Sequence, residues 1–392
     1  MIKNPINNSN THLNSPTFFD KKKIIGIVLW TILLFGLIVI VIKFVLDIDF
    51  HNLLQTISNL DDTNRFLILA IVLSIINFFI VFLVRILNYS IKLRKVVHEK
   101  ISYFDWIKHS FVGVFMQMIT PFSIGSEPYF VWWLSRKGVS RQKIGTIIGT
   151  NLLAWSAMQT IITWPSFIAY SVDNSAAIVS GQVTYIYYIV MFGLLIDITM
   201  LALIFGINYS RRIHVAISST IHFFRKILKM KYITREEIVE KYKNNASYKI
   251  AFRKEILEWD TLILVFNNFV ATMLLYVIFV LFYYGFNPFS GALIPWNTMF
   301  NIINIGTTAN NFVPIPNVEG TLQFTLNGLV SFSEIINNAD LNNQIANSIF
   351  AWRFFTNYLI FAVSLIFIVF LGSYFFTKKT IKYRRKKLNR SF

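Results

Sequence analysis

TPFSIGSEP at residues 120–128 and VPIPNVEG at residues 313–320 interrupt two long apolar stretches, at about 104–134 and 292–333. Each interruption places prolines and a glutamate where the flanking residues read as membrane-buried helix. A charged side chain at the bilayer centre costs about 2.5 to 3.5 kcal/mol, and lipid cannot replace the hydrogen bond that a proline removes. We therefore expect two half-helices or a re-entrant hairpin in each stretch, with the break facing protein or water.

The composition is that of an integral membrane protein. Hydrophobic residues make up 55% of the chain and charged residues 14%, whereas charged residues approach about a quarter of a soluble domain. The net charge of +18 sits in short runs between apolar segments, which is typical of membrane topology and argues against a nucleic-acid partner. Because the chain has no cysteine, it has no disulfide, thiolate metal site or cysteine nucleophile.

Apolar length predicts an all-α polytopic membrane protein with six full transmembrane helices besides the two broken hairpins. Residues 1–20 are rich in asparagine and predict a disordered cytoplasmic tail rather than a cleaved signal peptide. The transmembrane domain is expected at 21–376, followed by a basic cytoplasmic tail at 377–392. The six full spans are predicted at 24–46, 66–91, 144–170, 184–207, 259–284 and 350–376.

The distribution of lysine and arginine predicts the sidedness of a multi-pass protein of the plasma membrane. Basic runs before the first span, after the second, after the first hairpin, at 208–258 and at the C-terminus should be cytoplasmic, as should both termini. The acidic connection at 47–65 and the segment between Lys254 and Arg353, which has no basic residue, should face out. The first hairpin would then enter from the inside and the second from the outside.

This sidedness predicts an inverted-topology repeat. The unit of helix, hairpin and helix at about 66–170 would recur in the opposite orientation at about 259–376. The alternative is two unrelated kinks in a structural bundle, because kinked helices are common in membranes.

Residues 208–258 form the one sizeable polar segment between spans. Apolar residues recur at helical spacing from Ile213 to Leu228 among lysines and arginines, which predicts a basic amphipathic helix on anionic inner-leaflet lipid. The alternative is a linker that sets topology without lipid selectivity. The C-terminal basic tail follows the same logic. A homo-oligomer is compatible with the sequence.

Glu127 and Glu319 are the first candidate site residues. Each lies near the expected start of a half-helix, beside the breaking residues. One interpretation is therefore that the carboxylate caps the N-terminus of the half-helix and is stabilised by the helix dipole. The other is a polar site for a charged headgroup, formed where the two half-helix ends meet from opposite sides. The breaking residues are Pro121, Gly125, Pro128, Pro314 and Pro316.

Three further charged residues lie in apolar spans. Arg85, expected in the last turns of its helix, either snorkels to the interface or serves the site. Arg353, expected to open its helix at the outer end, needs a partner such as Glu319 or a lipid phosphate, unless it is an interfacial anchor. Asp197 is either a functional residue or a helix-to-helix hydrogen-bonding group.

Neutral polar residues follow the same regions, and either line an aqueous groove or join helices. Phosphate-loop, zinc-protease, nucleophile-elbow and dinucleotide motifs are absent from the sequence, and the six histidines are scattered. No catalytic residue, cofactor or metal ligand is therefore predicted. The polar residues are Asn151, Trp155, Gln159, Asn301, Asn304, Thr307, Asn310 and Asn311.

These motifs resemble the membrane domain of the lysylphosphatidylglycerol synthetase and flippase family, MprF-like, with its stand-alone YbhN-like members. The resemblance covers most of residues 20–376. It rests on Arg85, on TPF with Gly125, Glu127 and Pro128 followed by LSRKGVS at 134–140, and on VPIP with Glu319. It also rests on Gly320 and on Arg353 with Tyr358. Family members usually carry a glycine-rich stretch before the second glutamate, whereas this chain has only Asn317 and Val318 there.

The resemblance implies translocation of a lipid between leaflets, with the paired hairpins around the headgroup. The synthase activity of full-length members resides in a cytosolic domain after the membrane part, and the sequence ends at Phe392. We therefore expect a flippase-like transporter of a phospholipid or a related aminoacylated or glycosylated amphiphile. The glutamates would contact a cationic group or titrate during the transport cycle, and Arg85 and Arg353 would contact a phosphate. Glutamine at either glutamate would slow translocation and leave folding intact. The rivals are an interfacial lipid- or glycolipid-synthesising enzyme, a secondary transporter of a soluble substrate and a structural partner protein.

Overall fold

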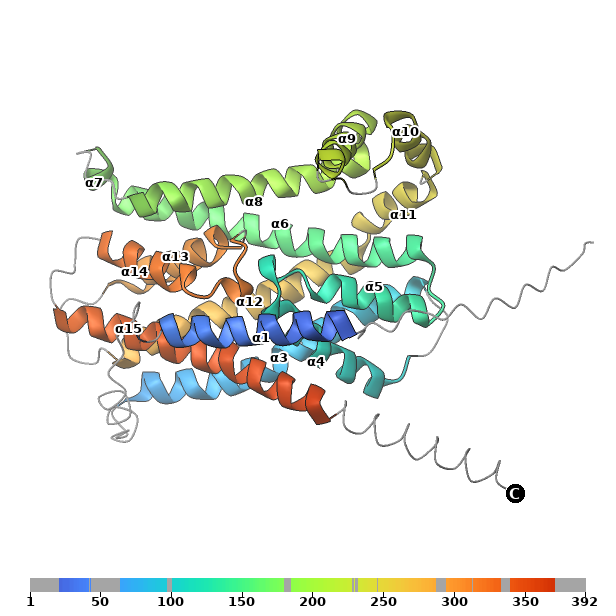
Figure 1. The fold of residues 1–392 in the computed structure, drawn as a ribbon. Helices are drawn as coiled ribbons and strands as arrows, with labels where there is room; N and C mark the ends of the chain where they lie inside the picture. The colour runs from blue at the N-terminus through green and yellow to red at the C-terminus, as the bar shows by residue number, and fades with distance from the viewer. Residues whose placement is uncertain are drawn as a thin grey trace, which may run out of the picture.

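A computed structural model describes residues 21–41, 43, 64–96, 101–179, 185–227, 229, 232–244, 246–286, 294–311, 313–332 and 339–370. These residues form helices without a strand, and most of the helices run side by side in a bundle (Figure 1). The predicted tails at 1–20 and 377–392 lie outside the described residues. The bundle helices are α1 (Lys21–Ile40), α3 (Arg65–Val96), α4 (Tyr103–Ile119), α5 (Ser126–Arg136), α6 (Arg141–Asp173), α8 (Tyr185–Tyr209), α12 (Trp259–Phe286), α13 (Trp296–Ala309), α14 (Thr321–Phe332) and α15 (Ala339–Arg353).

Four helices are long and apolar enough to cross a membrane, which confirms the prediction of a multi-pass membrane protein. They are Arg65–Leu93, Tyr185–Tyr209, Trp259–Phe286 and Ile345–Phe370, and they correspond to four of the six predicted spans. The span predicted at 144–170 is the continuous helix α6, whose many polar residues lower its hydropathy. The span predicted at 24–46 falls partly outside the described residues, so the count of six stays a prediction.

Both interrupted stretches are broken helices, as the prolines predict. In the first, α4 and α5 are joined through a 3-10 turn, η2 (Pro121–Ser123), and pack against each other. In the second, α13 and α14 are joined through η3 (Pro316–Val318) and also pack against each other. The turns η2 and η3 touch, so the two breaks meet each other.

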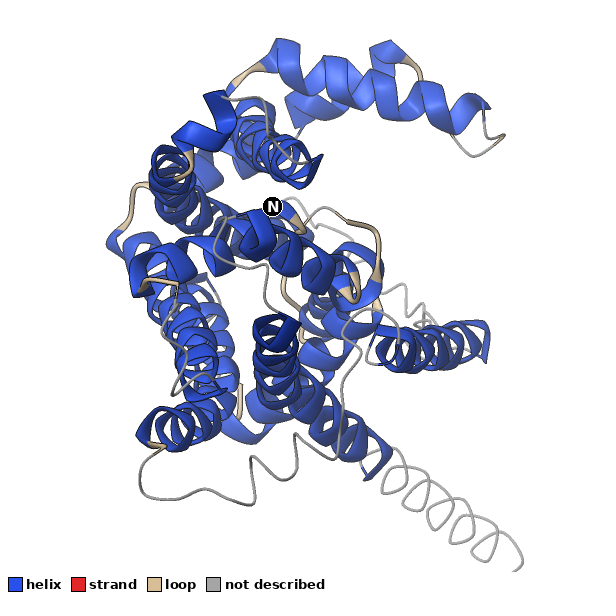
Figure 2. Cartoon of the chain, turned by 90° about the vertical axis from the view of Figure 1, so that its left-hand side faces the viewer, coloured by secondary structure: helices blue, strands red, loops and turns tan. Residues whose placement is uncertain are grey.

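Buried apolar side chains form two clusters, one around each broken helix. One cluster centres on the second hairpin and includes Phe279, Ile302 and Leu326. The other centres on the first hairpin and includes Phe115 and Phe130. Figure 2, which looks along the bundle, shows most of the bundle helices end-on. The long contact between α3 and α12 joins the two halves. It includes hydrogen bonds of Asn88 with two asparagines of α12.

The polar segment between α8 and α12 folds as three helices, here called the polar lobe. They are α9 (Arg211–Ile227), α10 (Arg235–Asn244) and α11 (Ala246–Ile256). Two contacts fix α11 to the bundle. Lys92, which is 1% exposed, bonds Glu255 at 2.9 Å, and Arg253 donates to the carbonyl oxygens of Asn208 and Tyr209 at the end of α8. The lobe is therefore held firmly against the helices that it connects.

Candidate functional site

The two breaks have the same backbone conformation. In each, a proline begins a 3-10 turn and the next two residues have positive φ, 56° and 54° at Phe122 and Ser123, and 54° and 50° at Asn317 and Val318. A non-glycine residue with positive φ is uncommon, and for a β-branched residue such as Val318 it is a strained conformation. The chain thus turns abruptly in a left-handed bend before each second half-helix starts.

A glycine follows at the same spacing in both breaks. Gly125 donates its N–H to the hydroxyl of Thr120 at 2.8 Å, and Gly320 donates to the side-chain oxygen of Gln323 at 2.8 Å. Gly320 has φ +86°, which side chains rarely adopt, and a Cβ there would lie 3.1 Å from a methyl group of Val41. Both glycine N–H groups are therefore already bonded to side chains.

Glu319 of the second break is fully paired. Its Oε2 accepts from Arg353 at 2.6 Å, and its Oε1 accepts from the Tyr358 hydroxyl at 2.5 Å and from Gln323. The Arg353 side chain is 4% exposed and that of Glu319 is 0% exposed. Arg353 also donates to the carbonyl oxygen of Asn317, inside the break itself, at 2.8 Å. Such a buried, charge-assisted network holds the break to the last helix.

A π-helix positions the two donors that reach Glu319 from the last helix. After α15 the chain continues as a π-helix at Phe354–Tyr358 and then as α-helix to residue 370. In an α-helix of 3.6 residues per turn, residues five apart face well away from each other. The wider π turn brings Arg353 and Tyr358 towards one face, so both contact the same carboxylate.

Glu127 of the first break is only partly paired. Its Oε1 accepts from the hydroxyl of Ser126 at 2.7 Å, whereas its Oε2 is buried without a hydrogen-bond partner among the described residues. Arg85 lies within electrostatic range of this carboxylate but donates to the side chain of Gln117 on α4. A Cβ on Gly113 would lie 3.1 Å from Nη1 of Arg85, so the guanidinium fits against a position without a side chain. The first break therefore holds a carboxylate and a guanidinium that are not paired with each other.

Two predicted positions of these arginines are wrong. Arg85 is not in the last turns of its helix, because α3 continues to Val96, and its guanidinium is bonded to Gln117 on α4 rather than directed to the interface. Arg353 does not open its helix, because α15 is helical from Ala339. The residues before Arg353, NNQIANSI at 342–349, are too polar to read as a membrane span. They nevertheless include Ile345, Ser348 and Ile349, which are buried against the protein.

Asp197 accepts a hydrogen bond from Thr160 of α6 at 3.0 Å, which is the helix-to-helix contact proposed as one of its two interpretations. Its second oxygen, Oδ1, is buried and has no partner among the described residues, so the other interpretation stays open. Gly193, one turn earlier on α8, lies directly against the backbone of Ala309, where α13 runs into the second break. Asp197 thus belongs to the wall of the second hairpin.

Several of the predicted neutral polar residues join helices. Gln159 donates to the Tyr276 hydroxyl at 3.0 Å and also to Thr308, and Asn304 bonds Thr163 at 2.9 Å. These contacts tie α6 to α12 and α13. Others keep a buried polar atom without a partner among the described residues: Asn151 Oδ1, Thr307 Oγ1 and Asn311 Nδ2.

Three residues of the site were not among the predicted ones: Gln117, Gln323 and Ser126. Gln323 lies four residues after Glu319 at the start of α14, and this spacing could have indicated a contact. Gln117 lies four residues before Pro121, on the half-helix that faces Arg85. No local sequence signal pairs it with Arg85, because the two residues lie on different helices.

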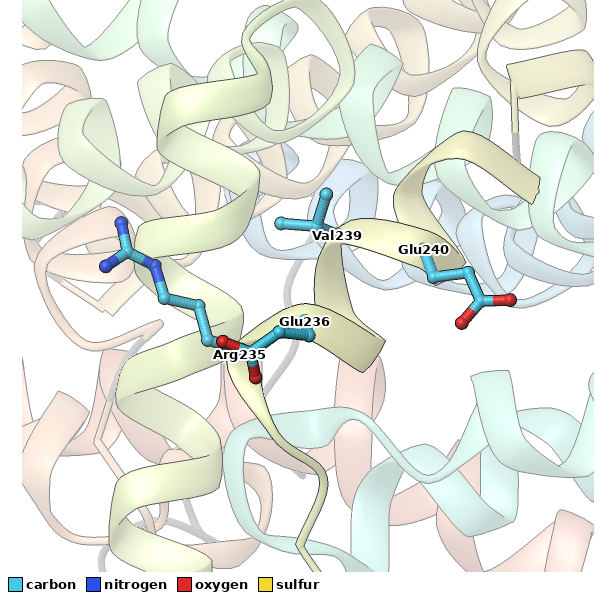
Figure 3. A pocket seen from close by; sticks show the side chains of 4 residues that line it. All are labelled: Arg235, Glu236, Val239 and Glu240. Atoms are coloured by element: carbon cyan, nitrogen blue, oxygen red, sulfur yellow. The ribbon is translucent and has the colours of Figure 1, made fainter.

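A surface hollow of about 470 Å³ lies on the polar lobe, away from the breaks. It is lined by Arg235, Glu236, Val239 and Glu240 of the single helix α10, and Figure 3 shows these side chains diverging along the helix. Side chains that do not converge cannot surround a ligand, so the broken helices remain the candidate site.

Comparison with known proteins agrees with the sequence resemblance. The model of the family described as the lysylphosphatidylglycerol synthase TM region matches residues 24–364. A Mycoplasma pneumoniae protein named as uncharacterized is 30% identical over 353 residues, which cover 88% of this chain and 87% of that protein. Another uncharacterized protein, from Mycoplasma genitalium, is 28% identical over 397 residues, which cover 96% of this chain and 97% of that protein. No solved structure matches this chain. The chain belongs to the family defined by the transmembrane region of lysylphosphatidylglycerol synthase.

Proposed function

We propose that this protein moves a lipid between the two leaflets of the plasma membrane, with the headgroup passing the first broken helix. Membership of the family supports a membrane role related to lipid. The substrate class that we propose is a phospholipid or a related aminoacylated or glycosylated amphiphile. The proposed role is transport rather than synthesis, and it requires no cofactor.

The observation that carries the proposal is the unpaired charge at the first break. Glu127 keeps a buried oxygen without a partner, and Arg85 is held nearby by a neutral amide. A carboxylate and a guanidinium that do not neutralise each other complement a headgroup that carries both an ammonium group and a phosphate. In our proposal Glu127 contacts the cationic group and Arg85 the phosphate.

We assign the second break to a different task. Both oxygens of Glu319 are bonded, to Arg353, Tyr358 and Gln323, so this carboxylate is not free for a ligand while the network is intact. Arg353 keeps one buried nitrogen, Nε, without a hydrogen-bond partner among the described residues. We propose that this network holds the second hairpin in place and exchanges partners when the headgroup passes. In our proposal Asp197, in the wall of the same hairpin, is a third charged group beside Glu319 and Arg353 that the headgroup passes.

The shared backbone of the two breaks supports an inverted repeat of about 66–170 and 259–376. Each break has a proline, two left-handed residues and a glycine four positions after the proline. In addition, α1, which precedes the first unit, packs on α4, as α8, which precedes the second unit, packs on α13. We propose that these halves rock against each other around the meeting point of the breaks.

The test is a reconstitution. Purified protein is placed in liposomes with fluorescent lipids of several headgroups, and exposure of each lipid to a membrane-impermeant quencher is followed over time. We expect movement with the native protein, and a rate at least about tenfold lower with Glu127→Gln, since a contact worth about 1.4 kcal/mol at the barrier changes a rate tenfold.

The matched control is Glu240→Gln, which makes the same chemical change on the exposed helix α10. Its rate should equal that of the native protein. No movement of any lipid by folded native protein would contradict the proposed function. Equal rates for Glu127→Gln and Glu240→Gln would contradict the assignment of the site.

A further inference from the structure

Helix α9 of the polar lobe has two chemically different faces. At about 100° per residue, its apolar side chains fall on one side and its basic side chains on the other, and the helix has no acidic residue. The apolar stripe consists of Ile213, Ile217, Ile221, Phe223, Phe224 and Ile227. The basic residues are Arg211, Arg212, Arg225 and Lys226.

The helix lies across the direction of the bundle. Figure 1 looks nearly along the axis of α9, whereas α8 runs across the view, so α9 turns away from the direction of α8. Figure 2, turned by 90°, shows the lobe extending sideways above the bundle. Since α8 is a membrane-spanning candidate, α9 runs roughly parallel to the plane of a bilayer at the end of that span.

The apolar stripe faces the bundle side of α9. Ile213, at its start, packs on Gly206 near the end of α8, where a Cβ would lie 2.9 Å from the isoleucine Cδ1. The other side of α9 is covered by α10: His214 contacts Tyr242 with ring centroids 5.0 Å apart, and the ring of His222 accepts the N–H of Ile233. The polar lobe thus covers one face and leaves the stripe open.

Towards the end of α9 the stripe is largely exposed. The exposed fraction is 61% for Phe223, 57% for Phe224 and 59% for Ile227. Large exposed apolar side chains on one side of the helix, basic residues on the other side and an axis parallel to a bilayer plane are the features of a helix that lies in the membrane interface.

We propose that α9 is an interfacial anchor whose apolar stripe enters the anionic lipid surface around the end of α8. Its basic residues would contact lipid phosphates, each adding about 1 kcal/mol of attraction in a membrane with anionic lipid. Continuity with the α8 span and the excess of positive charge favour lipid over a protein partner. This anchor is independent of the translocation proposed above.

The natural absence of cysteine allows a direct test in the full-length protein. Phe224→Cys and, as a matched control, the exposed Glu240→Cys of α10 are labelled with a nitroxide in nanodiscs. Accessibility to oxygen, which concentrates in lipid, is compared with accessibility to a water-soluble nickel chelate. We expect the ratio of oxygen to nickel accessibility to be at least several-fold higher for the label at position 224.

Lipid charge supplies the second arm. Nanodiscs with phosphatidylglycerol should give a higher ratio for the label at 224 than nanodiscs of phosphatidylcholine alone, and Arg225→Gln with Lys226→Gln should remove that difference. Equal ratios at 224 and 240 in both bilayers would overturn the anchor. Equal ratios at 224 in the two kinds of nanodisc would overturn the choice of anionic lipid. Thermal unfolding of each labelled protein checks that the helix is intact.

Discussion

The two breaks share a backbone but differ in how their charges are satisfied. At the second break both oxygens of Glu319 are bonded, to Arg353, Tyr358 and Gln323, and the pair is almost completely buried. At the first break Glu127 has one bonded oxygen, and Arg85 is bonded to an amide instead. The same turn therefore holds a closed ion pair in one half of the molecule and an open pair of charges in the other.

This difference separates stability from binding. A buried ion pair that loses one partner leaves an uncompensated charge, whereas a carboxylate without a cationic partner loses little when it is made neutral. The second break should therefore contribute to the free energy of unfolding, and the first should contribute to the affinity for a charged ligand. Substitutions can test each half of this statement.

The largest expected effect is on the stability of Glu319→Gln compared with Glu127→Gln. The first change leaves Arg353 buried without its counter-charge and should cost about 3 to 5 kcal/mol. The second removes no ion pair and should change the free energy of unfolding by at most about 1 kcal/mol. Unfolding by a denaturing detergent, followed by tryptophan fluorescence, measures both.

The double variant Glu319→Leu with Arg353→Leu is the control for this experiment. Because it removes both charges, it should be more stable than either single leucine variant. Equal losses of stability for Glu127→Gln and Glu319→Gln would mean that the two breaks do not differ in the way described.

An intermediate effect is expected for Tyr358→Phe. The phenylalanine keeps the ring but removes the hydroxyl that donates to Glu319 at 2.5 Å, and a hydrogen bond to a charged group contributes about 1.5 to 3 kcal/mol. The variant should be destabilised in the detergent assay. The same change at Tyr89, whose ring stacks on Phe130 near the first break, should be milder. Among the described residues, Glu127 accepts from Ser126 and not from the Tyr89 hydroxyl, so no hydrogen bond to this carboxylate is lost. A larger loss at Tyr89 than at Tyr358 would count against the closed network.

Much of the fold follows from single-residue chemistry. A proline removes a helical hydrogen bond that lipid cannot replace, so the prolines and the glutamate of each interruption predicted two broken helices with nearly correct bounds. A single proline is not enough, because α6 continues through Pro165. The helix before Arg353 was missed because hydropathy counts apolar residues, while protein neighbours can bury a helix that is polar. Glu319 was one of the two partners predicted for Arg353, because a buried cation needs an anion, and the structure pairs these residues.

The remaining parts of the site depend on geometry that no local pattern encodes. The π-helix that directs Arg353 and Tyr358 to one carboxylate leaves no composition signal. The residue pattern also treats Glu127 and Glu319 alike, as acids beside a proline break. Their difference arises because Glu319 precedes Gly320 directly and belongs to the bend, whereas Glu127 lies two residues after Gly125, within α5.

The smallest expected effect concerns the backbone that the two breaks share. Ser123 and Asn317 both have φ 54°, but asparagine tolerates this left-handed conformation better than serine does. Glycine at either position removes the steric cost of the side chain and adds entropy to the unfolded chain, so the two terms partly cancel. We expect Ser123→Gly to stabilise the protein by up to about 1 kcal/mol and Asn317→Gly to leave it nearly unchanged. If Asn317→Gly gave the larger gain in the detergent unfolding assay, the backbone strain would lie mainly in the second break. The ion pair of Glu319 and Arg353 would then hold a bend that forms more easily in the first half of the molecule.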